Sequence, residues 1–265
     1  MQSIEKTIIK TLAELEHLRM PVRKEWLFRF LLYKLTPKDL FEERLKTLIE
    51  ENKIRTRGGY YSLSKIPRSK LVHLKNKIQE RNKKVAQTVR LLKILPFIKA
   101  AFLFEIPLSK RRVKLIIITE KNRVYSAYHF AKLFSRFLQP DYYEGLKKFA
   151  FFVSRDNLYL EKILNDSRDP NLLFGLASLR PVLGKMFYVK FAMANPWIKK
   201  YFPNLEQGVE FDDEKGLFGF LSFMLEKIIC LFKPNDREKR LRKKIKKILR
   251  GKRVVVRREL LYYSK

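Results

Sequence analysis

The clearest pattern in the chain is a pair of short apolar runs joined by a basic turn. Residues 98–104 and 113–119 are bounded and rich in β-branched and aromatic side chains, which is typical of buried strands. Segments with apolar residues at helical spacing lie on either side, at 86–95 and 126–138. The pattern predicts the order helix, strand, turn, strand, helix. We expect Ala100, Phe102, Ile116 and Ile118 to be buried in one sheet.

The first 62 residues show three helical patterns followed by a hairpin signal. The helical patterns cover 4–18, 25–35 and 36 to about 52, and the third begins with Thr36 as the predicted N-cap and Pro37 in the first turn. The segment KIRTRGGYYS then places Gly58 and Gly59 between short β-prone stretches. Three helices and a hairpin are the element order of a winged helix.

The remainder of the chain continues as a mixture of helices and strands. A basic, helix-prone run over 66–95 ends at Pro96. The pattern predicts a third strand over 147–154, helices over 171–179 and 185–193, and a final strand over 254–263. We therefore predict an α+β protein.

Charge is the most unusual property of the composition. The 265 residues include 59 Lys and Arg against 27 Asp and Glu, a formal net charge of +32. Self-repulsion on this scale points to a polyanionic partner, either nucleic acid (RNA or DNA) or an anionic membrane surface. The single cysteine excludes a disulfide framework, and the start MQSIEKTIIK carries charges where a signal peptide needs an apolar core. Both features favour a cytoplasmic protein.

Two basic segments are the candidate contacts for nucleic acid. The predicted hairpin carries arginines beside tyrosines, and residues 233–258 contain fourteen Lys and Arg. Within 233–258, Leu241, Ile245 and Leu249 recur every fourth residue, which predicts a helix with one apolar face and basic faces elsewhere. The predicted nucleic-acid-binding residues are Arg55, Arg57, Arg240, Arg242, Lys243, Lys246, Lys247, Arg250 and Arg253.

The most apolar window, 216–232, admits two interpretations. It is shorter than the roughly 20 residues of a membrane span and is interrupted by Glu226 and Lys227. A buried core helix is the first interpretation. An amphipathic helix on a membrane surface is the alternative, and with the basic segment that follows it gives a third functional class, a membrane-surface or scaffold protein using 216–258.

The arrangement of elements around 98–119 resembles the nucleotidyltransferase superfamily related to DNA polymerase β. In that family the first strand leads into a Gly-Ser pair and the second carries an Asp-x-Asp triplet; here these places hold Phe104-Glu105 and Arg112-Val113-Lys114. The sequence LPFI at 95–98, ANPWI at 194–198 and YFPN at 201–204 are similar to further landmarks of the family. Over nearly its full length the chain resembles uncharacterised bacterial proteins that join a winged helix to a nucleotidyltransferase domain.

The replaced motif changes the chemistry that the resemblance implies. Nucleotidyl transfer needs two divalent cations held by carboxylates. Arg112 and Lys114 repel such cations and have no acceptor atoms, which leaves Glu105 as the nearby carboxylate. We therefore expect a catalytically inactive protein that holds no metal or cofactor. An active metal-dependent enzyme with atypical ligands, Glu105 among them, is the alternative.

The predicted organisation has four parts. They are a winged-helix-like domain (1–65), a basic linking helix (66–96), a nucleotidyltransferase-like core with a small mixed sheet (97–205) and a helical, basic C-terminal region (206–265).

Overall fold

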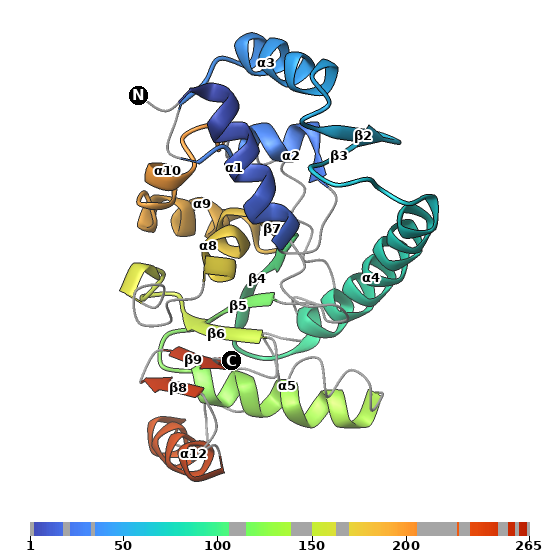
Figure 1. Cartoon of the computed structure of the whole chain (residues 1–265). Coiled ribbons are helices and arrows are strands. Elements are labelled where there is room, and N and C mark those ends of the chain that lie inside the picture. Colours follow the sequence, from blue (N-terminus) through green and yellow to red (C-terminus); the bar gives the residue numbers. More distant parts are fainter. Residues whose placement is uncertain are drawn as a thin grey trace. The chain divides into compact units, whose positions relative to one another are not determined.

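The structure is a computed structural model that describes residues 3–17, 22–32, 35–105, 115–138, 150–162, 170–205, 227, 234–248, 254–257 and 260–263. Over these residues the chain is an α+β protein (Figure 1). It groups into two compact units, the first formed by Met1–Glu80, Asp169–Ala177 and Pro196–Gly208, and the second by the remaining residues. The predicted four-part division stays a prediction.

The first unit combines helices with a small antiparallel sheet. Its helices are α1 (Ile4–His17), α2 (Lys24–Arg29), α3 (Lys38–Glu50), α8 (Pro170–Ala177) and α10 (Ile198–Tyr201). Its strands β1 (Val22–Arg23), β2 (Arg55–Arg57) and β3 (Tyr60–Ser62) pair in the order β1-β3-β2. Gly58 and Gly59 turn the β2–β3 hairpin with positive φ angles, as the sequence predicts.

Aromatic rings fill the centre of the first unit. Phe174 and Phe202 lie 5.1 Å apart between ring centroids, and Phe30 contacts both of them. The buried Asn204 joins the same unit through polar contacts, because its Oδ1 accepts a hydrogen bond from the Thr36 N–H at 3.0 Å. These contacts connect α8 and the segment after α10 to residues near the amino terminus.

The second unit is built on a mixed sheet. Its strands are β4 (Ile98–Phe104), β5 (Leu115–Thr119), β6 (Ala150–Ser154), β7 (Leu179–Leu183), β8 (Val254–Arg257) and β9 (Leu260–Tyr263). They pair in the order β7-β4-β5-β6-β9-β8, with β5 and β6 parallel and the other neighbours antiparallel. Its helices are α5 (Val124–Leu138), α9 (Lys185–Ala194) and α12 (Pro234–Ile248). The 27-residue α4 (Arg68–Ile94) begins in the first unit and ends in the second.

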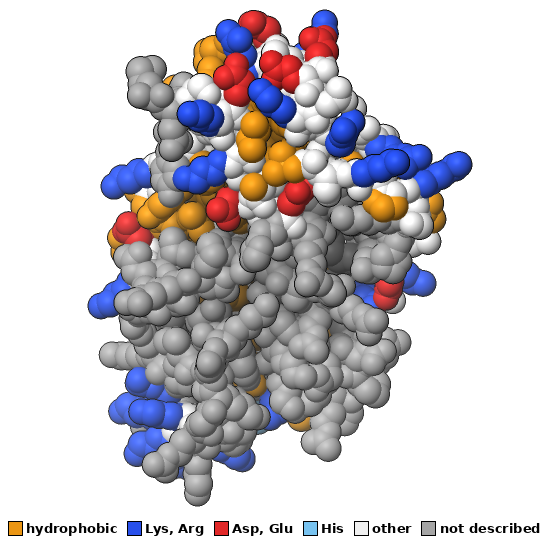
Figure 2. Space-filling model, in the orientation of Figure 1, with side chains coloured by type: hydrophobic (Ala, Val, Ile, Leu, Met, Phe, Trp, Pro, Cys, Tyr) orange, Lys and Arg blue, Asp and Glu red, His pale blue; other side chains and the backbone are white. Residues whose placement is uncertain are grey.

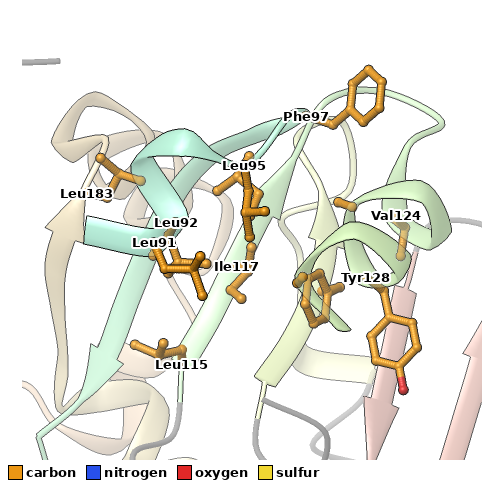
Figure 3. Close-up of a cluster of buried hydrophobic side chains, with 14 of the residues drawn as sticks. Leu91, Leu92, Leu95, Phe97, Leu115, Ile117, Val124, Tyr128 and Leu183 are labelled. Atoms are coloured by element: carbon orange, nitrogen blue, oxygen red, sulfur yellow. The ribbon is translucent and has the colours of Figure 1, made fainter. Parts of the chain in front are cut away.

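One apolar cluster holds the second unit together. Leu92 and Leu95 near the end of α4 pack with Ile117 of β5, Val124 of α5 and their neighbours (Figure 3). Ala100, Phe102, Ile116 and Ile118 each have 0% exposed surface, which confirms their predicted burial in one sheet. Their burial follows from the strongly apolar composition of β4 and β5, which is typical of strands covered on both faces.

Several predicted boundaries were wrong, each for a physical reason. Pro37, and not Thr36, occupies the N-cap of α3, because the Pro37 carbonyl accepts the first hydrogen bond of the helix, from the Phe41 N–H at 3.0 Å. Helix α2 ends at Arg29 and not at residue 35, as the chain leaves helical geometry at Phe30. Residue 179 was expected in a helix but begins β7, a strand that the sequence pattern does not predict because Pro181 lies within it.

The C-terminal segment also differs from its prediction. Residues 254–263 form two strands and not one, and β9 pairs with β6, so this segment extends the main sheet. The helical part of the prediction is met by α12. The apolar window 216–232 lies outside the described residues apart from Lys227.

Candidate polyanion-binding surface

Helix α12 carries the basic segment of the C-terminal region and packs with its apolar side chains against α5 and the sheet. Ile245 is buried and Leu241 is half-buried, and both belong to the cluster around α5 and the sheet. The predicted four-residue spacing of apolar side chains therefore fixes the inner face of the helix. The described part of this inner face ends at Ile245, since Leu249 lies beyond it.

The outer face of α12 carries only cationic side chains among its described positions. Successive residues of a helix are turned by about 100°, so Lys239, Lys243 and Lys246 form one row and Arg240 and Lys244 a second row beside it. All five side chains are exposed. Figure 2 shows Lys and Arg side chains gathered at the lower end of the view, where Figure 1 places α12.

Glu238 fixes the first part of α12 to the amino end of α5. Its Oε1 accepts a hydrogen bond from the Tyr125 N–H at 2.7 Å, and its Oε2 accepts one from the Ser126 N–H at 3.0 Å and another from the Ser126 hydroxyl. The first N–H groups of a helix have no partner inside the helix, so Glu238 satisfies two of them. Burial raises the pKa of Glu238, although these hydrogen bonds act in the opposite direction.

Arg242 lies differently from the other basic residues of α12. Its side chain is half-buried and interacts with the hydroxyl of Tyr125. Burial raises the pKa of Tyr125 to about 12, and the interaction with Arg242 acts in the opposite direction. Arg242 was predicted to contact nucleic acid, and this position gives it a role in docking α12 on α5. The exposed Lys239 and Lys244 were not among the predicted contacts, although helical spacing from Lys243 and Arg240 could have identified them.

The hairpin of the first unit presents its two predicted arginines at the surface. Arg55 and Arg57 are both exposed on β2. Each guanidinium is held locally: Arg55 Nη1 donates to Asn52 Oδ1 at 2.8 Å, and Arg57 Nη1 donates to the Ile66 carbonyl at 3.0 Å. The hairpin is therefore a second basic surface, with two fixed cations where α12 has five.

The remaining predicted basic residues are not fully described. Lys247 lies on α12, but the description does not extend to its side chain, and Arg250 and Arg253 lie outside the described residues.

Of the residues predicted to form a degenerate catalytic site, the structure describes Phe104 and Glu105. Phe104 ends β4 and is buried, and Glu105 follows it with its carboxylate 2.8 Å from Arg180 Nε. A carboxylate engaged by a guanidinium is a poor ligand for a second cation. Arg112 and Lys114 lie outside the described residues. Among the residues that are described, no three His, Cys, Asp or Glu side chains gather as a metal site would require.

A network of ion pairs that the sequence did not predict lies at the opposite end of β4 and β5. Glu120 follows β5 and contacts Arg155 Nε at 2.9 Å and Lys99 Nζ at 3.3 Å. Asp156, just after β6, contacts Lys121 at 3.1 Å. The signal available in the sequence was their position directly after two predicted strands. These side chains neutralise one another in part and leave an excess of positive charge.

Comparison with known proteins gives no relative for this chain. No protein-family model, no curated protein and no solved structure matches it. Across the described helices, none is long and apolar enough to cross a membrane.

Proposed function

We propose that this protein binds nucleic acid through its basic surfaces, with the outer face of α12 as the main contact, and that it does not catalyse nucleotidyl transfer. The observation that carries the proposal is the row arrangement of Lys239, Lys243 and Lys246 beside Arg240 and Lys244. No acidic side chain interrupts these rows among the described positions. Neutralising phosphates releases their counterions, which is the main source of affinity for such a surface.

The composition of this face favours binding without sequence preference. Lysine carries a compact point charge on a flexible stem, whereas the planar fork of arginine and the amides of asparagine and glutamine fix a bidentate contact to a base edge more rigidly. Four of the five exposed cations are lysines. The contacts are therefore to backbone phosphates, and the affinity should be similar for all sequences.

The nucleotidyltransferase-like part of the proposal rests on the order of elements in the second unit. Two antiparallel strands, β4 and β5, lie between α4 and α5, and β6 runs parallel to β5. This order supports the resemblance that the sequence suggests. The three helices α1, α2 and α3 at the start of the first unit, together with its three-stranded sheet, likewise support the winged-helix interpretation.

The absence of catalysis is proposed from the residues at the motif positions. Arg112 and Lys114 stand where the family has carboxylates, and Glu105 is engaged by Arg180. Two-metal transfer requires oxygen ligands for both cations. An enzyme with atypical ligands, Glu105 among them, is the competing hypothesis.

Charge reversal on the outer face of α12 tests the proposal. The variant Arg240→Glu, Lys243→Glu, Lys244→Glu is compared with the control Lys83→Glu, Lys199→Glu, Lys200→Glu, whose positions are also exposed. Both variants lower the net charge equally. Binding of an oligonucleotide is measured by fluorescence anisotropy over a series of salt concentrations.

We expect five phosphate contacts to give a slope of log affinity against log salt of about −4.5 for duplex and about −3.5 for single strands. The α12 variant should flatten the duplex slope by about 2.7 and weaken binding equally for different sequences, while the control keeps most of the affinity. Equal losses in the two variants would reject α12 as the main contact. Binding to anionic vesicles, with none to RNA or DNA at physiological salt, would reject the nucleic-acid proposal in favour of a membrane surface.

A further inference from the structure

The amino end of α5 has the geometry of an anion site. Strand β5 ends at Thr119, and α5 begins at Val124 after a short turn. The N–H groups of Tyr125 and Ser126 and the Ser126 hydroxyl converge on one negatively charged group, the carboxylate of Glu238. Backbone N–H groups and the helix dipole together favour negative charge at this position.

The position of this helix end in the sheet strengthens the assignment. Strands β5 and β6 are parallel, and Thr119 lies opposite Ser154 at their carboxyl ends. Ligands of open α/β sheets bind beyond the carboxyl ends of parallel strands, where a helix begins. Glu238, which comes from a helix more than a hundred residues further along the chain, occupies that place here.

Ser154 is a second and independent indication of a ligand. Its side chain has 0% exposed surface, and its hydroxyl has no hydrogen-bond partner among the described residues. Phe152, two positions earlier on β6, packs against Tyr128 of α5 with ring centroids 5.5 Å apart. Side chains alternate along a strand, so Ser154 faces the same α5 layer, at the end where α5 begins. A buried hydroxyl without a partner is unfavourable, and an oxygen of a bound ligand would satisfy it.

The carboxylate of Glu238 is bound at the amino end of α5 in an environment that disfavours its negative charge. Glu238 is 9% exposed, and its burial raises the pKa of the carboxyl group against the hydrogen bonds and the positive charge of Arg123. A phosphate monoester carries about two negative charges near neutral pH and three terminal oxygens, against one charge and two oxygens for a carboxylate. It could accept the three hydrogen bonds now made to Glu238 and have an oxygen available for Ser154.

We propose that the amino end of α5 is a binding site for a phosphate monoester, and that Glu238 occupies it as an internal substitute that such a ligand displaces. The phosphate could belong to a free nucleotide or to the 5′ end of a nucleic acid. The site is distinct from the outer face of α12 and does not depend on it for its donors.

Replacing Glu238 tests the site directly. Binding of AMP and of inorganic phosphate is measured by titration calorimetry for the wild-type chain, Glu238→Ala and the control Glu161→Ala, which removes one negative charge from the same unit. We expect Glu238→Ala to bind AMP at least tenfold more tightly than the control. Adding Ser126→Ala or Ser154→Ala should weaken that binding severalfold. Equal affinities of Glu238→Ala and Glu161→Ala would overturn the proposal.

A second measurement uses the wild-type chain and tests the proposal even if Glu238→Ala fails to fold. In the wild-type chain labelled with ¹⁵N, saturating AMP should shift the amide resonances of Tyr125 and Ser126 more than those of the exposed α12 residues. Unchanged Tyr125 and Ser126 resonances at saturation would overturn the proposal. The α12 charge-reversal variant should still bind AMP, which separates this site from the nucleic-acid surface.

The source of the phosphate is distinguished with matched oligonucleotides. At a salt concentration that suppresses binding to α12, Glu238→Ala is titrated with one sequence bearing a 5′-phosphate or a 5′-hydroxyl. Preference for the 5′-phosphate supports a nucleic-acid end as ligand, and equal weak binding with tight AMP binding supports a free nucleotide. Absence of binding to either phosphate source would overturn the site.

Discussion

The Asn195 side chain holds Leu160 in place: its Oδ1 accepts a hydrogen bond from the Leu160 N–H at 2.8 Å. Its Nδ2 donates to the carbonyl groups of Leu158 and Phe191, each at 2.8 Å. The end of α9 is thereby joined to the segment after β6. Asn195 is 1% exposed and its three hydrogen bonds are buried. Water therefore does not reach these backbone groups and cannot replace the Asn195 side chain as their partner.

Substituting Asn195 should destabilise the protein strongly. In Asn195→Ala the buried backbone groups lose their partners, and we expect the free energy of unfolding to fall by about 2–4 kcal/mol. The control Asn82→Ala, at an exposed position of α4, should change it by less than about 0.5 kcal/mol. Urea denaturation followed by circular dichroism measures both. Similar midpoints for the two variants would contradict the bridging role.

Gly184 offers a comparison between two glycines with positive φ. A Cβ at Gly184 (φ +68°) would lie 2.3 Å from the Lys99 carbonyl oxygen, whereas a Cβ at Gly59 (φ +78°) has no atom within 4 Å. Gly59→Ala should therefore cost about 1 kcal/mol from backbone strain alone. Gly184→Ala adds a clash with the backbone and should cost about 3 kcal/mol or more. Thermal unfolding of both variants checks the order, and an equal loss in the two would show that the contact with Lys99 is easily relieved.

The raised pKa of Glu238 predicts a particular pH dependence of stability. The folded chain holds the proton of this carboxyl group more tightly than the unfolded chain, in which the pKa is about 4.5. The contribution of Glu238 to the free energy of unfolding should therefore fall as the pH rises from about 4.5 through the raised value, and become constant above it. Glu238→Gln lacks the titrating carboxyl group. The free energy of unfolding of the wild type should therefore fall relative to that of the variant as the pH rises through this interval.

Denaturant titrations at a series of pH values measure that difference. All other groups are shared by the two chains and contribute equally. A difference that moves in favour of the wild type as the pH rises would mean that the hydrogen bonds from Tyr125 and Ser126 outweigh burial and lower the pKa.

The proposed loss of catalysis has a direct assay. With Mg²⁺ and a radiolabelled nucleotide, the purified chain should give no incorporation above background, because the motif positions carry Arg112 and Lys114 in place of carboxylates. Glu105→Gln should not change this result. Incorporation that Glu105→Gln abolishes would establish an active enzyme and reject the proposal.

The pattern of apolar and polar residues predicted those strands and helices whose apolar residues are buried at the expected spacing. The run 98–104 coincides with β4, since a continuous apolar segment of that length can be buried in a sheet with little ambiguity. Strand β7 was missed because Pro181 argues against a strand, and only the order β7-β4 shows that it lies outermost on its side of the described sheet.

The candidate surface was predictable only in part, because its cations lie on one helix whereas the contacts that hold this helix on α5 come from distant segments. Exposed cations on α12 follow from helical spacing, and the sequence predicted Arg240, Lys243 and Lys246 on that basis. The role of Glu238 has no local signal, since its partner Tyr125 lies 113 residues away. Arg242 was predicted to contact nucleic acid because spacing gives the relative positions of residues on a helix and does not show which neighbours they meet.

Pro181 also bears on how the protein avoids self-association. An outermost strand presents free donors and acceptors with which a strand of another chain can pair, and such pairing starts aggregation. Pro181 has no N–H to donate, and the neighbouring Arg180 is paired with Glu105 while its side chain stays half exposed. Within the described sheet, the β7 edge therefore offers an incomplete ladder and a polar side chain to an incoming strand. Replacing Pro181 with valine would complete the row of donors, and the tendency to form intermolecular sheet should rise.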